Sequence, residues 1–175
     1  MQGIKIYKNL TWLNQLSTAE AKAAFLDCCG STAWAGRMTE SRPFPMLENL
    51  YSAAEDTWFS LSPADHLEAF AAHPQIGSKS AAPSQKKQAA DWSAREQSGV
   101  SHAADSVREQ LADANRLYKN KFGFIFIVYA SGKTADEMLA ICRARQGNSV
   151  ETELKIAAQE QHKITETRLN KLLEK

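Results

Sequence analysis

The sequence predicts an all-helical fold in a single domain that spans residues 1–175. Along most of the chain, apolar residues recur at three- and four-residue steps, the spacing of one buried helix face. A single stretch is rich in β-branched and aromatic residues, and one strand cannot form a sheet. With 43% hydrophobic residues, the chain can bury a core. We therefore expect about seven to nine helices around one aromatic segment.

The first half of the chain contains clear helix starts. Ser17 and Glu20 have the spacing of a capping box, which predicts a helix that ends near Gly30. Proline favours the first helical position, so Pro63 predicts another start. Together with apolar periodicity, these signals predict helices over residues 17–30, 31–41, 46–61 and 63–73.

The second half gives weaker signals before residue 107. Residues 78–91 are polar and predict a surface loop or loose helix that borders a cleft. Ser93 and Glu96 again have capping-box spacing, which favours a helix that begins there. Apolar periodicity then predicts helices over residues 107–122, 135–146 and 150–173.

The aromatic segment covers residues 122–129, with the sequence FGFIFIVY. We expect it to be buried among helices, either extended or partly helical. Some of its backbone groups would then be available to a partner other than a neighbouring strand. This makes the segment a sensible place for a ligand.

Composition limits the partners of the chain. Its 21 basic and 20 acidic residues leave a net charge of +1, which gives no reason to expect nucleic acid or an anionic membrane. No apolar run approaches the length of a bilayer span. The N-terminus lacks the apolar core of a secretory signal, and the C-terminus is no peroxisomal tripeptide, so a cytoplasmic location is the expectation.

Several common kinds of site have no support in the sequence. Cys28, Cys29 and Cys142 make neither a disulfide framework nor a zinc site, and we expect small buried residues in a reducing compartment. A glycine-rich phosphate loop, a nucleophile elbow and a zinc-binding His-Glu-x-x-His motif are all absent.

His73 is the first candidate for chemistry. Pro74 pushes the preceding residue out of the helical region, so His73 should lie at or just beyond a helix end. Burial lowers the pKa of an imidazole and a nearby carboxylate raises it, so this pKa can be poised near neutrality. On spacing alone, a charged residue that caps the helix end is the favoured alternative.

Arg168 is the second candidate, because it shares a helix face with Ile164 and Leu172. An inward arginine needs an anionic partner, either a structural carboxylate or a bound acid. Arg145 is a weaker case of the same kind. The remaining basic side chains considered are expected to be solvated surface groups: Arg37, Arg42, Lys86, Lys87, His66, His102 and His162. A histidine, a carboxylate at Glu96 and an inward arginine suit cofactor-free acid–base work on a small anion.

A set of short motifs runs nearly from end to end of the chain. They are Arg42-Pro43-Phe44, His73-Pro74 with Gly77, Ser93-x-x-Glu96-Gln97, Leu117-Tyr118, Lys121-Phe122-Gly123-Phe124-x-Phe126-Ile127, Arg145-x-x-Asn148, Glu153 and Lys163-Ile164-x-x-x-Arg168-Leu169. In this order and spacing, the chain resembles the 2-oxo-4-hydroxy-4-carboxy-5-ureidoimidazoline (OHCU) decarboxylases of the urate-to-allantoin pathway. Ile125 replaces a common proline, and the stretch after Gln97 lacks the usual Ala-Gly-Leu. Both departures can alter the shape of the pocket, and neither removes an ionisable group.

The resemblance implies a homodimeric enzyme that needs no metal or organic cofactor and converts OHCU to (S)-allantoin. It implies that His73 is the general acid and that Glu96 pairs with His73 or with the ureido N–H groups. The residues that it implies for substrate binding are Pro74, Ser93, Ala94, Arg95, Gln97, Phe126, Ile127, Val128, Tyr129, Ala130 and Arg168. The alternatives are a helical module that binds a small ureide or purine without turnover, and a helical protein-interaction domain.

Overall fold

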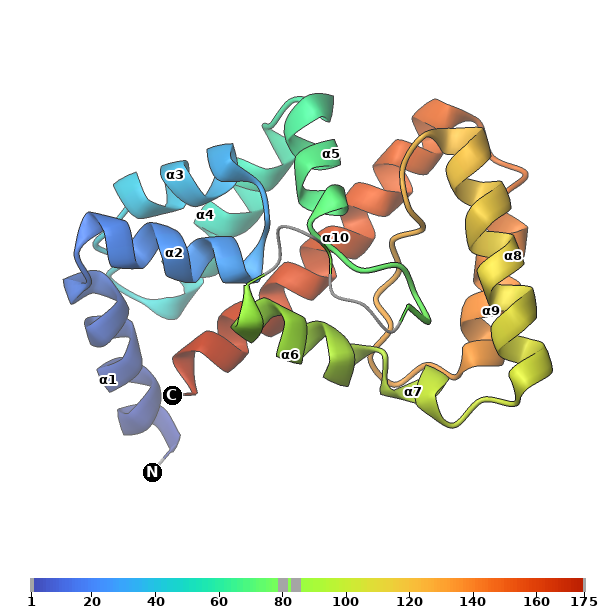
Figure 1. Cartoon of the computed structure of the whole chain (residues 1–175). Helices are drawn as coiled ribbons and strands as arrows, with labels where there is room; N and C mark the ends of the chain where they lie inside the picture. Colours follow the sequence, from blue (N-terminus) through green and yellow to red (C-terminus); the bar gives the residue numbers. More distant parts are fainter. Residues whose placement is uncertain (1, 79–81, 83–85, 175) are drawn as a thin grey trace. The chain divides into compact units, whose positions relative to one another are not determined.

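The computed structural model describes residues 2–78, 82 and 86–174 of the chain (Figure 1). In this described part the chain forms ten helices and no strand. The predicted all-helical fold is therefore confirmed, with slightly more helices than expected. Part of the predicted polar loop, at residues 79–81 and 83–85, lies outside the described residues.

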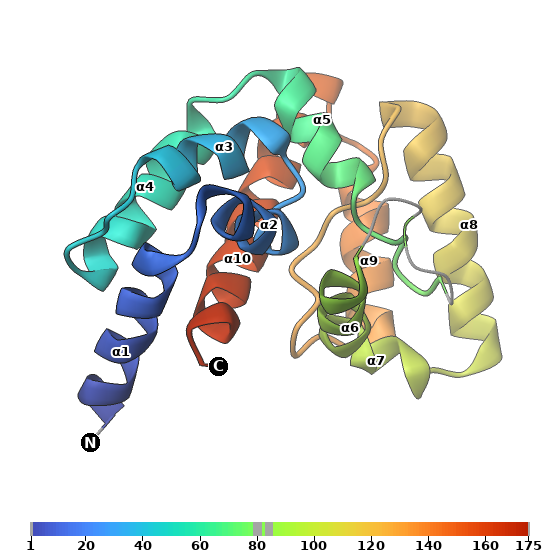
Figure 2. The ribbon, with the colours of Figure 1, turned by 60° about the vertical axis from the view of Figure 1, so that its left-hand side comes forward.

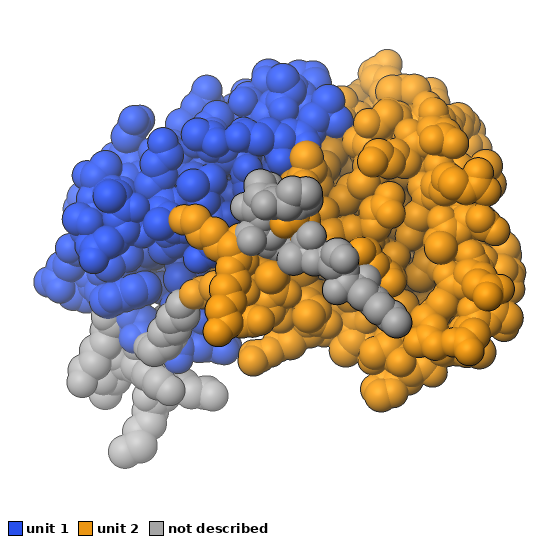
Figure 3. Space-filling view, in the orientation of Figure 1, with its two compact units in different colours: residues 1–69, 162–175 blue, residues 70–161 orange. Residues whose placement is uncertain are grey.

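The chain divides into two compact units, which Figure 3 shows in different colours. Unit 1 contains residues 1–69 and 162–175, and unit 2 contains residues 70–161. Two helices contribute residues to both units, α5 (Pro63–Ala71) and α10 (Val150–Leu173). Among the described helices, none combines the length and the apolar character that a bilayer crossing requires.

Unit 1 is built from the N-terminal helices and the last residues of α10. Its other helices are α1 (Gln2–Gln15), α2 (Thr18–Cys28), α3 (Thr32–Glu40) and α4 (Leu47–Phe59). Helix α3 packs against both α2 and α4. The buried rings of Phe25 and Trp34 meet edge to face, 5.8 Å apart, between α2 and α3. The capping box of Ser17 and Glu20 is present as predicted.

Arg42 is not the surface charge that the sequence predicted. Its Nη1 donates to the carbonyl oxygens of Leu13, at 2.9 Å, and Leu16, at 2.8 Å. The last carbonyls of a helix lack partners within that helix, and Arg42 supplies them at the end of α1. Asn14 also pairs with the backbone of Phe44 through both side-chain atoms. The Arg42-Pro43-Phe44 motif thus closes the end of α1.

Two of the three histidines expected to be solvated contact aromatic rings in unit 1. The His66 ring lies 4.3 Å from the ring of Trp58, and its Nε2 is 2.9 Å from the Trp58 carbonyl oxygen. The His162 ring lies 5.3 Å from that of Phe59. These two predictions are wrong, because neither ring is surrounded by solvent. His102, in unit 2, is exposed as expected.

Unit 2 consists of the remaining helices and the first residues of α10. They are α6 (Lys87–Glu96), α7 (Ser98–Ser101), α8 (Asp105–Phe122) and α9 (Ala135–Arg145). Helices α8 and α9 pack against each other, as Figure 2 shows. Gly123 ends α8 in the left-handed conformation, with φ of 80°, which only glycine adopts without strain.

Helix α6 begins seven residues earlier than the capping-box spacing predicted, because its N-cap is Lys86 and not Ser93. Its first residue is Lys87, so Ser93 and Glu96 lie in its last part. Both are buried, on the same face as Ala89 and Trp92. Residues three apart share a helix face, and the same spacing also defines a capping box. Here the helix face is the correct interpretation.

The aromatic segment and the residues after it connect α8 to α9 without helix or strand, at residues 123–134 (Figure 2). Its buried side chains include Phe124, Phe126, Ile127 and Val128. The ring of Tyr118 on α8 lies 5.4 Å from that of Phe126. The expected burial among helices is confirmed, and the partly helical alternative is wrong.

A substitution at Gly99 in α7 tests how closely α7 packs against Lys133, near the end of the segment that connects α8 to α9. A Cβ at Gly99 would lie 2.1 Å from the backbone oxygen of Lys133, so the backbone would have to move. We expect Gly99→Ala to lower the free energy of unfolding by about 1–3 kcal/mol, measured by denaturant titration.

Gly36 in α3 is the matched control, because a Cβ there meets nothing within 4 Å. Gly36→Ala should be neutral or stabilising by up to about 1 kcal/mol, since alanine favours a helix. Equal effects of the two substitutions would contradict the close approach of α7 to Lys133.

Candidate active site

His73 lies just beyond the end of α5, as the sequence predicted. Its backbone N–H donates to the Phe70 carbonyl at 3.1 Å. Its Nε2 lies 2.6 Å from Oε1 of Gln161, a fully buried residue of α10. An amide oxygen can only accept, so in this contact Nε2 of His73 is the donor. His73 is thus held by one hydrogen bond at its backbone and by another at its ring.

The turn that follows His73 is held by α8 and the residue after α6. Gly77 adopts a φ of 82°, and its N–H donates to Oε1 of Gln97 at 3.0 Å. Asn115 on α8 donates from Nδ2 to the carbonyl oxygen of Ile76 at 2.9 Å. Gln97, a predicted substrate ligand, therefore reaches the turn that carries His73 and Pro74.

The predicted site residues around α6 divide between two environments. Ser93 and Glu96 are buried, with exposed fractions of 3% and 8%. Ala94 and Arg95 are exposed, and Gln97 is half-buried. The structure thus places both polar groups of the Ser93-x-x-Glu96 motif on the inner face of α6 in unit 2, the unit of His73. The assignment of Ala94 and Arg95 to substrate binding stays a prediction.

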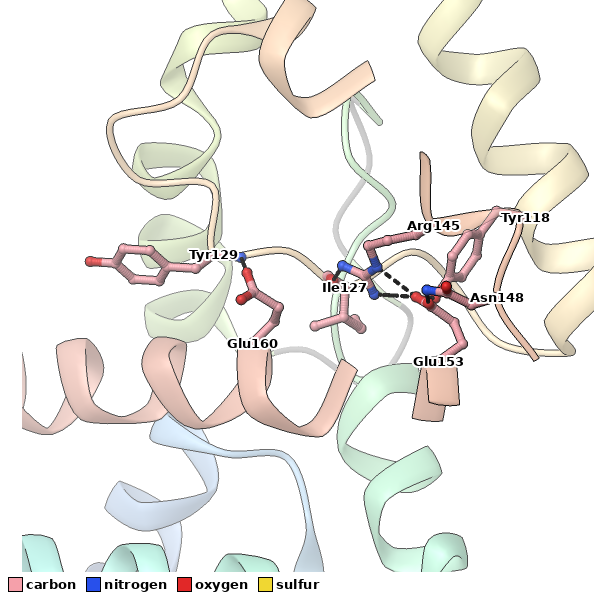
Figure 4. A network of polar contacts seen from close by, with 7 residues as sticks. All are labelled: Tyr118, Ile127, Tyr129, Arg145, Asn148, Glu153 and Glu160. Carbon is pink, nitrogen blue, oxygen red and sulfur yellow. Dashed lines mark hydrogen bonds and ion pairs between the residues drawn. The ribbon is translucent and has the colours of Figure 1, made fainter. Parts of the chain in front are cut away.

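A buried ion pair fixes the backbone of the aromatic segment (Figure 4). Arg145 at the end of α9 donates from Nε to Oε1 of Glu153 on α10 at 2.6 Å. From Nη1 it donates to the carbonyl oxygen of Ile127 at 2.7 Å. Its guanidinium also lies over the ring of Phe126, 4.8 Å from the centroid. The inward arginine predicted at 145 is confirmed, and its partner is a structural carboxylate.

Two further side chains complete the hydrogen bonds of this ion pair (Figure 4). The hydroxyl of Tyr118 donates to Glu153, and Nδ2 of Asn148 donates to the other carboxylate oxygen at 2.9 Å. Burial and the hydrogen bond to Glu153 raise the pKa of Tyr118 far above its usual value. The phenol therefore stays protonated and remains a donor at neutral pH.

A second carboxylate of α10 holds the segment two residues further on. Oε2 of Glu160 accepts from the backbone N–H of Tyr129 at 2.7 Å (Figure 4). Lys133 donates from Nζ to the Tyr129 carbonyl, also at 2.7 Å. Sequence reasoning missed both Glu160 and Gln161. For Glu160 the sequence held a usable signal, because Glu153 and Glu160 lie seven residues apart on the same face of α10.

These contacts leave part of the segment's backbone available. The carbonyl of Ile127 and both backbone groups of Tyr129 are engaged, and the carbonyl of Ala130 accepts from the N–H of Lys133 at 3.0 Å. Within the described residues, no hydrogen bond engages the backbone groups of Phe126 or Val128. The side chains of both residues are buried. A ligand that reached this backbone would find donors and acceptors ready to pair.

Arg168 lies in unit 1, whereas the other predicted site residues lie in unit 2. It is 3% exposed, so its predicted inward position is confirmed. Its Nη1 donates to the Asp27 carbonyl at 3.4 Å, near the C-terminus of α2, where the helix dipole favours a cation. Burial raises the pKa of the nearby Cys29 thiol to about 11, which fits the expected role of a small buried residue.

The described part of the chain contains no cluster of side chains suited to bind a metal ion. In residues 2–78, 82 and 86–174, no group of three or more His, Cys, Asp or Glu side chains could hold a metal ion. Cys28, Cys29 and Cys142 are buried and form no disulfide.

The ion pair can be tested by substituting its carboxylate. We expect Glu153→Gln to lower the free energy of unfolding by about 3–5 kcal/mol, because it leaves the charge of Arg145 buried without compensation. Urea titration measures this change.

Glu151→Gln on the same helix is the matched control, because Glu151 pairs with Lys155 at an exposed site. It should leave the midpoint of unfolding unchanged. Similar losses from both variants would show that Glu153 makes no special contribution.

Comparisons with known proteins agree on one family. A family model described as OHCU decarboxylase matches residues 14–170. The uric acid degradation bifunctional protein TTL of Arabidopsis thaliana is 47% identical over 147 residues, which are 83% of this chain and 45% of that protein. A decarboxylase of Haloferax volcanii, named for the same ureidoimidazoline, is 28% identical over 91% of this chain and 93% of its own length. The chain therefore spans about half the length of the Arabidopsis relative.

Solved structures give the same result. An OHCU decarboxylase crystallised in the presence of (S)-allantoin superimposes with a TM-score of 0.74 and 41% identity. The match covers 86% of this chain and 97% of that one. An (S)-allantoin synthase has a TM-score of 0.70 at 20% identity, which shows a shared fold.

Proposed function

Since the chain belongs to the family of OHCU decarboxylases, we propose that it removes CO2 from OHCU and forms (S)-allantoin during urate degradation. The observation that carries this proposal is the match to the decarboxylase solved with (S)-allantoin, at 41% identity over almost all of that protein. That decarboxylase was crystallised in the presence of (S)-allantoin, and this chain carries the His73-Pro74 and Ser93-x-x-Glu96-Gln97 motifs.

The chemistry needs few catalytic groups. The C–C bond to the carboxylate breaks, CO2 leaves, and the bonding electrons pass into the adjacent ring C=N as an enamine-like anion. The nitrogen of the former C=N takes up a proton. The 4-hydroxyl then loses its proton and becomes the carbonyl, while the neighbouring carbon, which bears the ureido group, gains a proton on one face, so that one proton is gained overall. The protein must therefore hold the ring, stabilise the developing charge and deliver one proton.

We propose that His73 is the general acid that donates the proton. Glu96 then sets the protonation state of the His73 imidazole. The backbone of His73 is fixed at the helix end, and Gln161 holds its ring. Glu96 is a buried carboxylate of the same unit. In this proposal Glu96 pairs with the imidazole or with the ureido N–H groups.

The remaining groups bind the substrate. The amide nitrogen of Gln97 is the suitable donor, because its oxygen already accepts from Gly77. Within the aromatic segment, we assign substrate hydrogen bonds to the backbone groups of Phe126 and Val128. No hydrogen bond within the described residues engages these groups.

Side chains carried over from the resemblance complete the proposed set. Ser93 hydrogen-bonds the ring, Pro74 forms part of the wall, and Arg168 binds anionic or carbonyl oxygens with its planar fork of donors. A homodimer and a cytoplasmic location are also proposals; the resemblance supports the first, and no metal or organic cofactor is assigned.

His73→Ala tests the proton donor. Loss of a general acid costs a factor of roughly 100 to 10,000 in rate, so we expect enzymatic conversion to fall nearly to background. The assay mixes the protein with freshly generated OHCU and follows optically active allantoin by circular dichroism. His102→Ala is the matched control, since His102 is exposed.

Two of three possible results would count against the proposal, and the remaining one calls for a second variant. Unchanged turnover in His73→Ala would remove His73 from the mechanism. Loss of turnover together with loss of the helical spectrum would reflect unfolding, and His73→Gln would then replace the alanine variant. Binding of OHCU by the wild-type protein without faster formation of one enantiomer would favour a non-catalytic binding module.

A further inference from the structure

We propose that Gln161 is a positioning residue for the proton donor, one that keeps a proton on Nε2 of His73 and fixes the plane of its ring. The catalytic consequence rests on the proposed function, whereas the effect on the imidazole does not. Gln161 did not stand out in the sequence as a site residue, and its side chain is fully buried.

The geometry of the contact sets the direction of the hydrogen bond. Oε1 of Gln161 lies 2.6 Å from Nε2 of His73. Because an amide oxygen has no proton to give, Nε2 must carry the hydrogen. Gain and loss of a proton by this imidazole then take place at Nδ1. A histidine whose second nitrogen is fixed in this way has a defined tautomer.

The position of Gln161 on α10 links His73 to the aromatic segment. Glu160, the preceding residue, accepts from the N–H of Tyr129 at 2.7 Å. Two consecutive residues of one helix therefore hold the two elements that the proposed mechanism brings together. Rigid support of this kind is what a catalytic group needs to stay aligned with its substrate.

The choice of an amide also has an electrostatic reason. A neutral acceptor orients the ring without adding a full charge beside it. A carboxylate in the same place would favour the charged imidazolium and raise the pKa of His73. An amide thus supplies orientation while leaving the control of protonation to other groups, including Glu96 in the proposed mechanism.

The test uses Gln161→Glu and Gln161→Met, with Gln159→Glu as the matched control. Gln159 lies on the same helix and is exposed, so its substitution adds the same charge in solvent. Heteronuclear NMR of ¹⁵N-imidazole histidine reads the tautomer and pKa of His73, whose signals are assigned with a His73→Gln variant. kcat and KM for OHCU are measured on the same samples, and thermal melting checks the fold.

We expect the neutral wild-type imidazole to carry its proton on Nε2. Gln161→Glu should raise the pKa of His73 by about one unit or more, and Gln159→Glu should leave it unchanged. Gln161→Met should give mixed tautomers and lower kcat by roughly 10- to 100-fold, with a much smaller change in KM.

A wild-type imidazole protonated on Nδ1 would overturn the inference, as would equal NMR titrations in all four proteins. If Gln161→Met fails to fold, Gln161→Glu alone decides the matter through the pKa. An absence of OHCU turnover in the wild type would refute the proposed function, and the NMR data would still test the role of Gln161.

Discussion

The buried ion pair between Arg145 and Glu153 is the interaction on which the rest of unit 2 depends. Two charges taken out of water stabilise a fold only when their remaining hydrogen-bonding positions are filled. Tyr118, Asn148 and the Ile127 carbonyl fill them here. The same contacts that compensate the burial of charge also hold a segment without regular structure in one conformation. One network of hydrogen bonds thus compensates the buried charges and also fixes the conformation of the aromatic segment.

Helix α10 supplies the acceptors on which this arrangement is built. Glu153 receives the guanidinium, Glu160 receives a backbone N–H of the aromatic segment, and Gln161 receives the imidazole. Each of these acceptors lies on a regular helix, whereas each donor belongs to a helix end or an irregular segment. Rigid elements position functional groups more accurately than loops do. The first part of α10 therefore acts as the frame for the groups that we assign to catalysis.

The features that the sequence predicted well are those with local causes. Caps and apolar periodicity give most helices, and a proline alone places His73 after a helix end. Ser93 was misinterpreted as a helix start because residues three apart fit both a capping box and a helix face. Arg42 is not the surface group that its local sequence predicts, because its partners are the carbonyls of Leu13 and Leu16 at the end of α1, more than 25 residues away. The contact of Gln161 with His73 spans 88 residues, and no local pattern encodes such a distance.

The central claim is that His73 and the backbone of Phe126 and Val128, which no hydrogen bond engages in the described part of the chain, form one site for a ureide. A crystal structure of the chain with bound (S)-allantoin tests it most directly. The account predicts a ligand that contacts the imidazole of His73 and hydrogen-bonds the backbone of Phe126 or Val128. A well-ordered ligand that touches neither the imidazole nor this backbone would contradict it.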